Sequence, residues 1–201
     1  MPKPKHLQLP RAVHQIAANQ ANSLGAQALK AAMTLKASVD AGHALAYLVN
    51  ASLAIELYIK AIMIIGRNGL LTTGHDLRAL ISEFPPGLLD VLRDSYEKHP
   101  TAKSARVRLV AMKLVPEGAN VPPTPPDALK PNYETFDAAI NSLTGVFVRA
   151  RYFFEELAGA EWAIFDCPND AIEAVLFALE RTYGELAAGK LAAALSSPPD
   201  G

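Results

Sequence analysis

One nearly apolar segment, residues 42–65, constrains the fold of this chain more than any other feature. Apolar side chains recur there at helical spacing and also occupy the remaining sides: Leu45, Leu48, Leu53, Ile55, Leu57, Ile59, Ile62 and Met63. A helix that is apolar nearly all round is buried in a protein core. The run Gly66-Arg67-Asn68-Gly69 then stops it. We therefore expect a buried central helix.

Two charged residues interrupt this segment. Glu56 and Lys60 are four residues apart with the acid first, which is the favourable order for a helical ion pair, and Ser52 extends the same line by one turn. Charges on a buried helix must be paired, face a polar cleft or reach out to solvent. Two interpretations remain open: an ion pair that orders the helix, and a polar stripe that lines a cleft or a subunit interface.

Composition excludes several classes of protein. Among the 201 residues, 50% are hydrophobic and 19% charged, which indicates one folded domain rather than disorder. The net charge of -1 provides no overall field for nucleic acid or an anionic membrane. Cys167 is the single cysteine, and the histidines show no metal-ligand spacing, so we expect no metal and no cofactor.

No segment predicts a membrane partner. The apolar stretch 55–65 is far shorter than the roughly 20 residues of a membrane span. Residues 1–10 contain prolines and basic residues but no apolar run of signal-peptide length. A cytoplasmic protein is the expectation, with 1–10 as a flexible arm and 196–201 as a flexible tail.

Other helical patterns surround the central helix. We expect a surface helix over 11–38, a helix from Asp76 that breaks at Pro85-Pro86 and resumes over 88–98, and a helix over 132–157. A last helix is expected to be capped at Asn169-Asp170, with Glu173 completing a capping box. The modest apolar face expected for the first helix comprises Ile16, Leu24, Ala28, Met33 and Leu35.

The region 99–131 differs from the rest. Six prolines between Pro116 and Pro131 exclude a regular helix or a central strand. Residues 106–115 fit either a short strand or a helical turn, and no other segment predicts a strand convincingly. The fold class is therefore all-α: an up-and-down bundle of four to five helices within a single domain, 11–195. A long Pro-rich loop is expected between the third and fourth main helices.

Two further groups of residues could bind a ligand. Arg149 and Arg151 point to opposite sides of their helix, and a buried Arg151 needs a carboxylate, for which Glu155 and Glu56 are both candidates. The second group is basic, with no acidic residue between Glu97 and Glu117. It comprises Lys98, His99, Lys103, Arg106, Arg108 and Lys113. Such a stretch can bind phosphates or can be a solvated loop.

Three segments, in order, resemble the HEPN-like helical domains, particularly the uncharacterised bacterial branch of that superfamily. They are Asn50–Ala61, Gly74–Leu77 and Phe147–Glu155, and the resemblance extends over about residues 40–185. It implies a helical bundle that forms a homodimer, in toxin–antitoxin, phage-defence or RNA-processing systems. Many such domains are metal-independent endoribonucleases with an Arg followed by four to six residues and a His, which act in proton transfer and charge stabilisation.

This chain departs from that pattern, because no His follows Arg149 or Arg151. One stretch, from Arg93 to His99, matches the spacing. The resemblance implies a polar cleft lined by Glu56, Lys60, His75, Arg151, Tyr152 and Glu155. Three hypotheses follow: a non-catalytic domain that binds RNA, a nucleotide or a partner such as a cognate antitoxin; an endoribonuclease using Arg93 and His99; and a purely structural dimerisation module.

Overall fold

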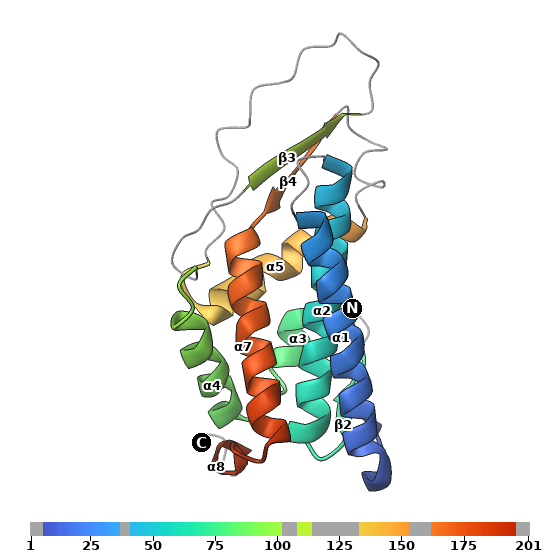
Figure 1. The fold of residues 1–201 in the computed structure, drawn as a ribbon, viewed down its shortest axis with the longest axis vertical. Helices are drawn as coiled ribbons and strands as arrows, with labels where there is room; N and C mark the ends of the chain where they lie inside the picture. The colour runs from blue at the N-terminus through green and yellow to red at the C-terminus, as the bar shows by residue number, and fades with distance from the viewer. Residues whose placement is uncertain (1–5, 37–40, 102–107, 114–132, 153–161, 196–201) are drawn as a thin grey trace.

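The structure, a computed structural model, describes residues 6–36, 41–101, 108–113, 133–152 and 162–195 (Figure 1). Most of these residues are helical, which confirms the predicted helical class. After a short 3-10 turn at Arg11–Val13, the helices are α1 His14–Lys36, α2 Ala41–Gly66, α3 Leu77–Ile81, α4 Pro86–Glu97, α5 Phe136–Arg151, α7 Asn169–Ala187 and α8 Ala192–Leu195. Helices α1, α2 and α7 run side by side, and α5 crosses them obliquely (Figure 1).

Helix α2 is the buried centre that the sequence predicts. Leu48, Ile55, Ile59 and Ile62 are fully buried, and the helix packs on α1, α7 and α5. Within the described part of the chain, α2 alone is long and apolar enough to cross a membrane, and its apolar length exceeds the stretch 55–65. However, 67% of that window is buried inside the protein. Packing in a core therefore accounts for its apolar character.

The face of α1 that contacts α2 differs from the prediction. Ile16, Leu24 and Met33, three of the residues expected to form its modest apolar face, are exposed. The buried residues of α1 are small: Ala18, Gly25, Ala28 and Ala32. A Cβ on Gly25 would lie 3.4 Å from the Tyr58 ring and 3.5 Å from the Ala54 carbonyl oxygen. The small residues let the two helix backbones approach closely, which a stripe of larger side chains would prevent.

Two short antiparallel ribbons accompany the helices. Strand β1, His6–Gln8, pairs with β2, Leu70–Thr72, with His6 opposite Thr72. Strand β3, Arg108–Lys113, pairs with β4, Trp162–Cys167, with Arg108 opposite Cys167. The segment left open between strand and helix is thus a strand. The expectation of no convincing strand elsewhere was wrong, since β1, β2 and β4 also form strands. Each pairs with a segment far along the chain, and local periodicity does not report such pairing.

The ends of two helices also bear on the predictions. Asp76 is the N-cap of α3, and its Oδ1 accepts hydrogen bonds from the backbone N–H groups of Arg78 and Ala79 at 3.0 and 3.2 Å. Helix α7 begins at Asn169 as expected, but its N-cap is Pro168, whose side chain makes no cap hydrogen bond. The predicted capping box was wrong, because Glu173 instead forms an ion pair with Lys36 of α1.

Much of the predicted loop 99–131 lies outside the described residues.

The close α1–α2 contact generates a stability prediction. We expect Ala32→Leu to lower the free energy of unfolding by about 1–3 kcal/mol, because the fully buried Ala32 has no room for a larger side chain. Ala31→Leu is the matched control, since Ala31 is the exposed neighbour on the same helix. Urea denaturation followed by circular dichroism measures both. Equal stability of the two variants would contradict the tight packing of α1 on α2.

Candidate functional site

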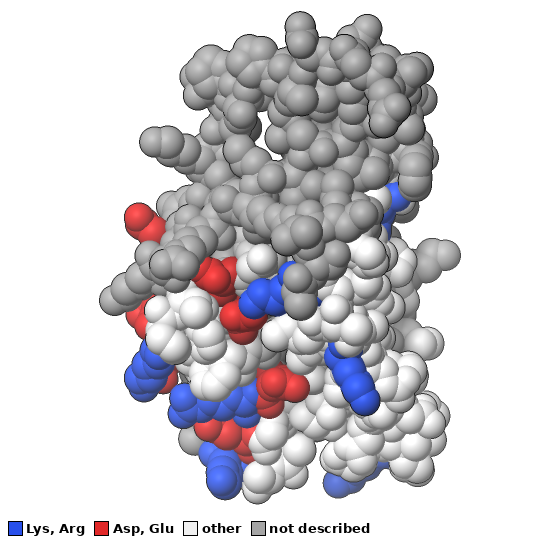
Figure 2. Space-filling model, turned by 45° about the horizontal axis from the view of Figure 1, so that its top comes forward, with Lys and Arg blue, Asp and Glu red and all other residues white. Residues whose placement is uncertain are grey.

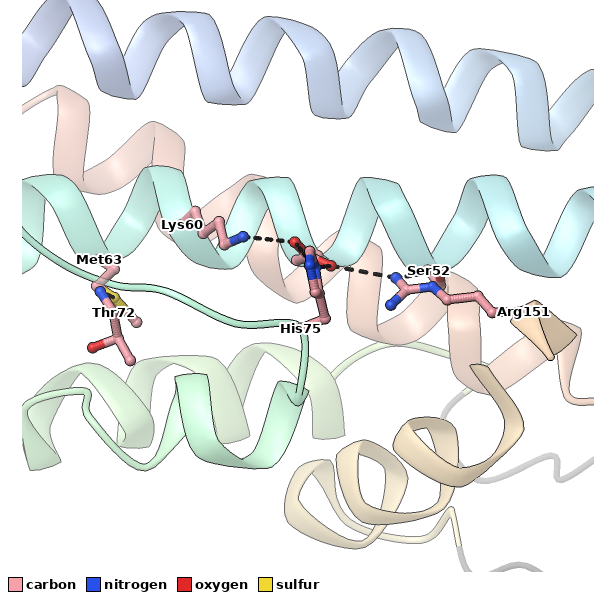
Figure 3. Close-up of polar contacts among 7 residues, drawn as sticks. Ser52, Lys60, Met63, Thr72, His75 and Arg151 are labelled. Carbon is pink, nitrogen blue, oxygen red and sulfur yellow. Dashed lines mark hydrogen bonds and ion pairs between the residues drawn. The ribbon is translucent and has the colours of Figure 1, made fainter. Parts of the chain in front are cut away.

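The carboxylate of Glu56 is the centre of the candidate site. Helix α2 buries this residue to 3% exposure, within an otherwise apolar surface. Lys60, one turn further along α2, donates to Oε1 at 2.6 Å. Nδ1 of His75 lies 2.9 Å from Oε1 and 3.0 Å from Oε2, and Arg151 donates from Nη2 to Oε2 at 3.3 Å (Figure 3). One carboxylate therefore joins α2, the loop before α3 and the end of α5.

Arg151 is fixed by a second hydrogen bond. Its Nη2 also donates to Oγ of Ser52 at 3.0 Å, and Ser52 in turn donates to the Val49 carbonyl oxygen at 3.0 Å. The sequence left Glu56 and Glu155 as alternative carboxylates for Arg151. The structure identifies Glu56 as a partner, whereas Glu155 lies outside the described residues. Both hydrogen bonds that Arg151 makes to the described residues come from Nη2. A guanidinium has five N–H donors in total.

His75 is positioned by the turn between β2 and α3. Gly74 has a φ of 129°, which favours glycine, and Asp76 starts α3 directly after His75. The turn places the imidazole over Glu56 while 73% of the side chain remains exposed. Because an ionised carboxylate only accepts hydrogen bonds, Nδ1 of His75 carries the proton and donates. In the neutral ring Nε2 then has a free lone pair to accept a proton.

The electrostatic balance keeps Glu56 ionised. Burial by itself would raise the pKa of Glu56, but the hydrogen bond and charge of Lys60, and then those of His75, lower the pKa below its ordinary value of 4.5. A buried carboxylate without these donors would become protonated instead. The donors therefore maintain a negative charge below the protein surface, and this charge holds three cationic or hydrogen-bonding side chains in place.

An open hollow of about 350 Å³ lies beside this cluster. It is lined by Val49, Leu53, Glu56, His75, Arg151 and Tyr152. Several of these are large apolar side chains with high exposure: Val49 is 36% exposed, Leu53 43% and Tyr152 56%. The hollow thus combines polar groups from Glu56, His75 and Arg151 with apolar walls. The resemblance implies a cleft lined by six side chains, and five of them lie together here. Glu56, His75, Arg151 and Tyr152 line the hollow, and Lys60 binds Glu56. The sixth, Glu155, lies outside the described residues.

The apolar walls were not identified from the sequence. Val49 and Leu53 precede Glu56 and Lys60 on the same stripe of α2. The sequence shows their helical spacing. It does not show that these two side chains are exposed, because apolar residues occupy nearly every side of this helix.

Arg93 and His99 do not form a pair in this structure. Arg93 donates to Asp137 at 2.8 and 3.3 Å and to Asp90 at 3.1 Å, and the hydrogen bond that Asp137 accepts is the main reason that the pKa of Arg93 is raised. The His99 ring packs against Phe177 of α7, with ring centroids 4.9 Å apart, and burial lowers the pKa of His99. The two side chains therefore engage different helices, α5 and α7.

The structure says less about the basic residues that were predicted to bind phosphates. Lys103 and Arg106 lie outside the described residues, and Arg108 and Lys113 form the two ends of β3. Lys98 pairs with Asp94 at 2.7 Å. Within the described ranges, no three His, Cys, Asp or Glu side chains converge as a metal site would require.

Comparisons with other proteins add no assignment. No family model, curated protein or solved structure matches this chain. The chemistry of the site is therefore interpreted from its own residues.

The lowered pKa of Glu56 predicts an acid-dependent contribution to stability. Because the unfolded state binds a proton more readily, this contribution is complete above pH 4.5 and is lost as the pH falls through the lower folded-state pKa. Urea midpoints measured between about pH 6 and about pH 3 should fall less steeply for Glu56→Gln than for the wild type. Glu97→Gln, at an exposed position of α4, is the control and should keep the wild-type slope. Parallel slopes for Glu56→Gln and wild type would contradict this assignment.

Proposed function

We propose that this chain is a HEPN-like helical domain that binds a nucleotide-containing ligand, RNA or a free nucleotide, at the site around Glu56. The observation that carries the proposal is the convergence of Lys60, His75 and Arg151 on one buried carboxylate beside an open hollow. The proposal includes an up-and-down bundle, a homodimer, and a role in a bacterial or phage defence or toxin–antitoxin system, with a cognate antitoxin as the partner.

Charge supports an anionic ligand. Lys60 and Arg151 are cations and Glu56 neutralises one of them, so the cluster keeps at least one positive charge. On the face drawn in Figure 2, acidic and basic side chains are interspersed, so the attraction would be local rather than spread over the surface. A planar guanidinium binds phosphate through paired hydrogen bonds, which favours Arg151 as the phosphate contact.

The apolar walls favour a nucleotide over a simple anion. Tyr152 directly follows Arg151 and its side chain is 56% exposed at the hollow. Stacking of a base on an aromatic ring contributes about 1–3 kcal/mol in proteins that bind single strands. Leu53 and Val49 add exposed apolar surface to the same hollow. A ligand with one phosphate and one base would use both the polar and the apolar parts of the hollow.

The three segments that carry the family resemblance also support a shared site. Glu56 and Lys60 belong to the first segment, His75 to the second, and Arg151 and Tyr152 to the third. Residues that are far apart in sequence are thus in contact where the resemblance is strongest. A purely structural dimerisation module gives no reason for Lys60, His75 and Arg151 to converge on one buried carboxylate beside an open hollow. The ribonuclease hypothesis based on Arg93 and His99 has less support, since Arg93 is paired with Asp137 and Asp90.

Binding measurements test the phosphate contact. Titration of the protein with adenosine monophosphate and with short single-stranded RNA, followed by calorimetry, should show binding. Arg151→Ala should weaken it about 10- to 100-fold, because a charge-assisted hydrogen bond contributes about 1.5–3 kcal/mol. The matched control Arg181→Ala removes an exposed arginine on α7 and should leave the affinity unchanged. Absence of binding to the wild type, or equal losses in both variants, would contradict the proposal.

The apolar wall is tested separately. Tyr152→Ala should weaken binding of the nucleotide about 5- to 100-fold, as loss of a stacked base predicts, while binding of inorganic phosphate stays as in the wild type. Circular dichroism on each variant reports whether the helices persist. If Tyr152→Ala lowers the affinity for both ligands equally without loss of helicity, the base does not stack on this ring.

A further inference from the structure

Strand β1 has one open edge. The backbone N–H of Leu9, directly after β1, donates to the Gly69 carbonyl oxygen at 3.0 Å. Hydrogen-bonded and non-hydrogen-bonded pairs alternate along an antiparallel ladder, so Leu7, two residues earlier, also directs its backbone N–H and C=O groups toward β2. The backbone groups of His6 and Gln8 therefore point to the opposite side. All three residues of β1 are exposed, so this edge can pair with a further strand.

The two edges of the β1–β2 ribbon differ in what covers them. On the β2 side, the Thr72 backbone N–H points away from β1 and donates to Sδ of Met63, so helix α2 closes that edge. On the β1 side, no hydrogen bond from the described part of the chain reaches the backbone N–H or C=O groups of His6 and Gln8. The ribbon therefore offers backbone donors and acceptors along β1 alone.

A hollow of about 460 Å³ adjoins the end of this edge. It is lined by Gln8, Leu9, Arg11, His14 and Asn68. None of these residues is acidic, and within the described ranges the guanidinium of Arg11 has no ion-pair or hydrogen-bond partner. His14 donates from Nε2 to the Leu9 carbonyl oxygen at 2.8 Å and packs on Gly69, where a Cβ would lie 1.9 Å from that nitrogen. The hollow thus has a fixed wall and an unpaired cation.

We propose that the open edge of β1 and the Arg11 hollow together bind an extended peptide segment of a partner protein, and that this segment carries an acidic side chain. The backbone of the segment pairs with His6 and Gln8 as a third strand, and its carboxylate contacts Arg11. In strand addition, main-chain hydrogen bonds supply affinity and a side-chain pocket supplies specificity. The surface shares no lining residue with the hollow beside Glu56, so the inference is independent of the proposed nucleotide binding.

Charge favours an acidic partner over a second copy of this chain. Residues 1–14 include Lys3, Lys5 and Arg11 and contain no Asp or Glu. These cations precede and follow β1, so pairing of two β1 edges would bring like charges together, whereas an acidic segment complements them. A nucleic acid also carries negative charge, but it lacks the alternating N–H and C=O groups that the edge of a strand requires.

Selection of random octapeptides displayed on phage, with the full chain immobilised, tests the inference. The enriched peptides should share an Asp or Glu at one position and should lack proline beside it. Calorimetry on a synthetic peptide should show binding about 2- to 5-fold weaker when the matching amide replaces that acid, as loss of an exposed ion pair predicts. This difference should disappear in Arg11→Gln. It should persist in the matched control Arg181→Gln, which alters an exposed arginine of α7.

Two measurements report whether the bound peptide forms a strand. Amide hydrogen exchange followed by NMR should slow at His6 and Gln8 when the selected peptide binds, and should change little at Leu7, which already pairs with β2. Peptides that are N-methylated at one amide at a time leave the protein unaltered. Methyl groups at alternate positions should abolish binding, because only every second amide of a strand faces its neighbour.

Three results overturn the inference. In the first, no peptide is enriched, or the enriched peptides bind without slowing exchange at His6 and Gln8. In the second, single-stranded RNA slows exchange at these amides and no peptide does, which assigns the surface to nucleic acid. In the third, protection of the same amides rises with protein concentration in the absence of peptide, which assigns the edge to a second copy of the chain.

Discussion

The buried carboxylate of Glu56 is the interaction on which both the core and the site depend. Removing an ionised carboxylate from water costs several kcal/mol unless hydrogen bonds and opposite charges compensate. Here the compensation comes from Lys60 on α2, His75 in the loop before α3 and Arg151 at the end of α5. Neutralising one central charge therefore holds three parts of the chain together. The same stripe of α2 carries the exposed apolar side chains of Val49 and Leu53 beside this charge.

The rest of the structure supports this anchor by other means. The backbone N–H of Thr72 in β2 donates to Sδ of Met63 in α2 at 3.1 Å (Figure 3). Strand β2 also pairs with β1. This fixes the start of the turn that carries His75. On the other side of α2, Tyr58 donates to Glu180 of α7 at 2.7 Å, and burial followed by that contact raises the pKa of Tyr58. The close contact with α1 needs only small residues, since it contributes packing rather than polar chemistry.

Chemical interpretation of the site depends on which residues share the carboxylate. With Lys60 alone, Glu56 would be an ordinary helical ion pair, and burial of such a pair carries little functional meaning. The addition of an exposed imidazole and a partly exposed guanidinium, next to apolar walls with open space, changes that interpretation. The sequence left open whether Glu56 and Lys60 form an ion pair or a polar stripe that lines a cleft. The observed arrangement agrees with the polar stripe, and the ion pair is one of its contacts.

The sequence by itself determined the elements with a strong local pattern. Helix α2 agrees with its predicted bounds to within one residue at each end, and α7 begins at Asn169. The chain also breaks between α3 and α4 near Pro85-Pro86. These features were predictable because helical periodicity and proline act within a few residues. Only the tertiary structure decided that Ile16 and Leu24 face solvent, that β1, β2 and β4 form strands, and that His75 meets Arg151 at Glu56. These outcomes depend on which distant segments lie opposite each other, and local spacing contains no information about that.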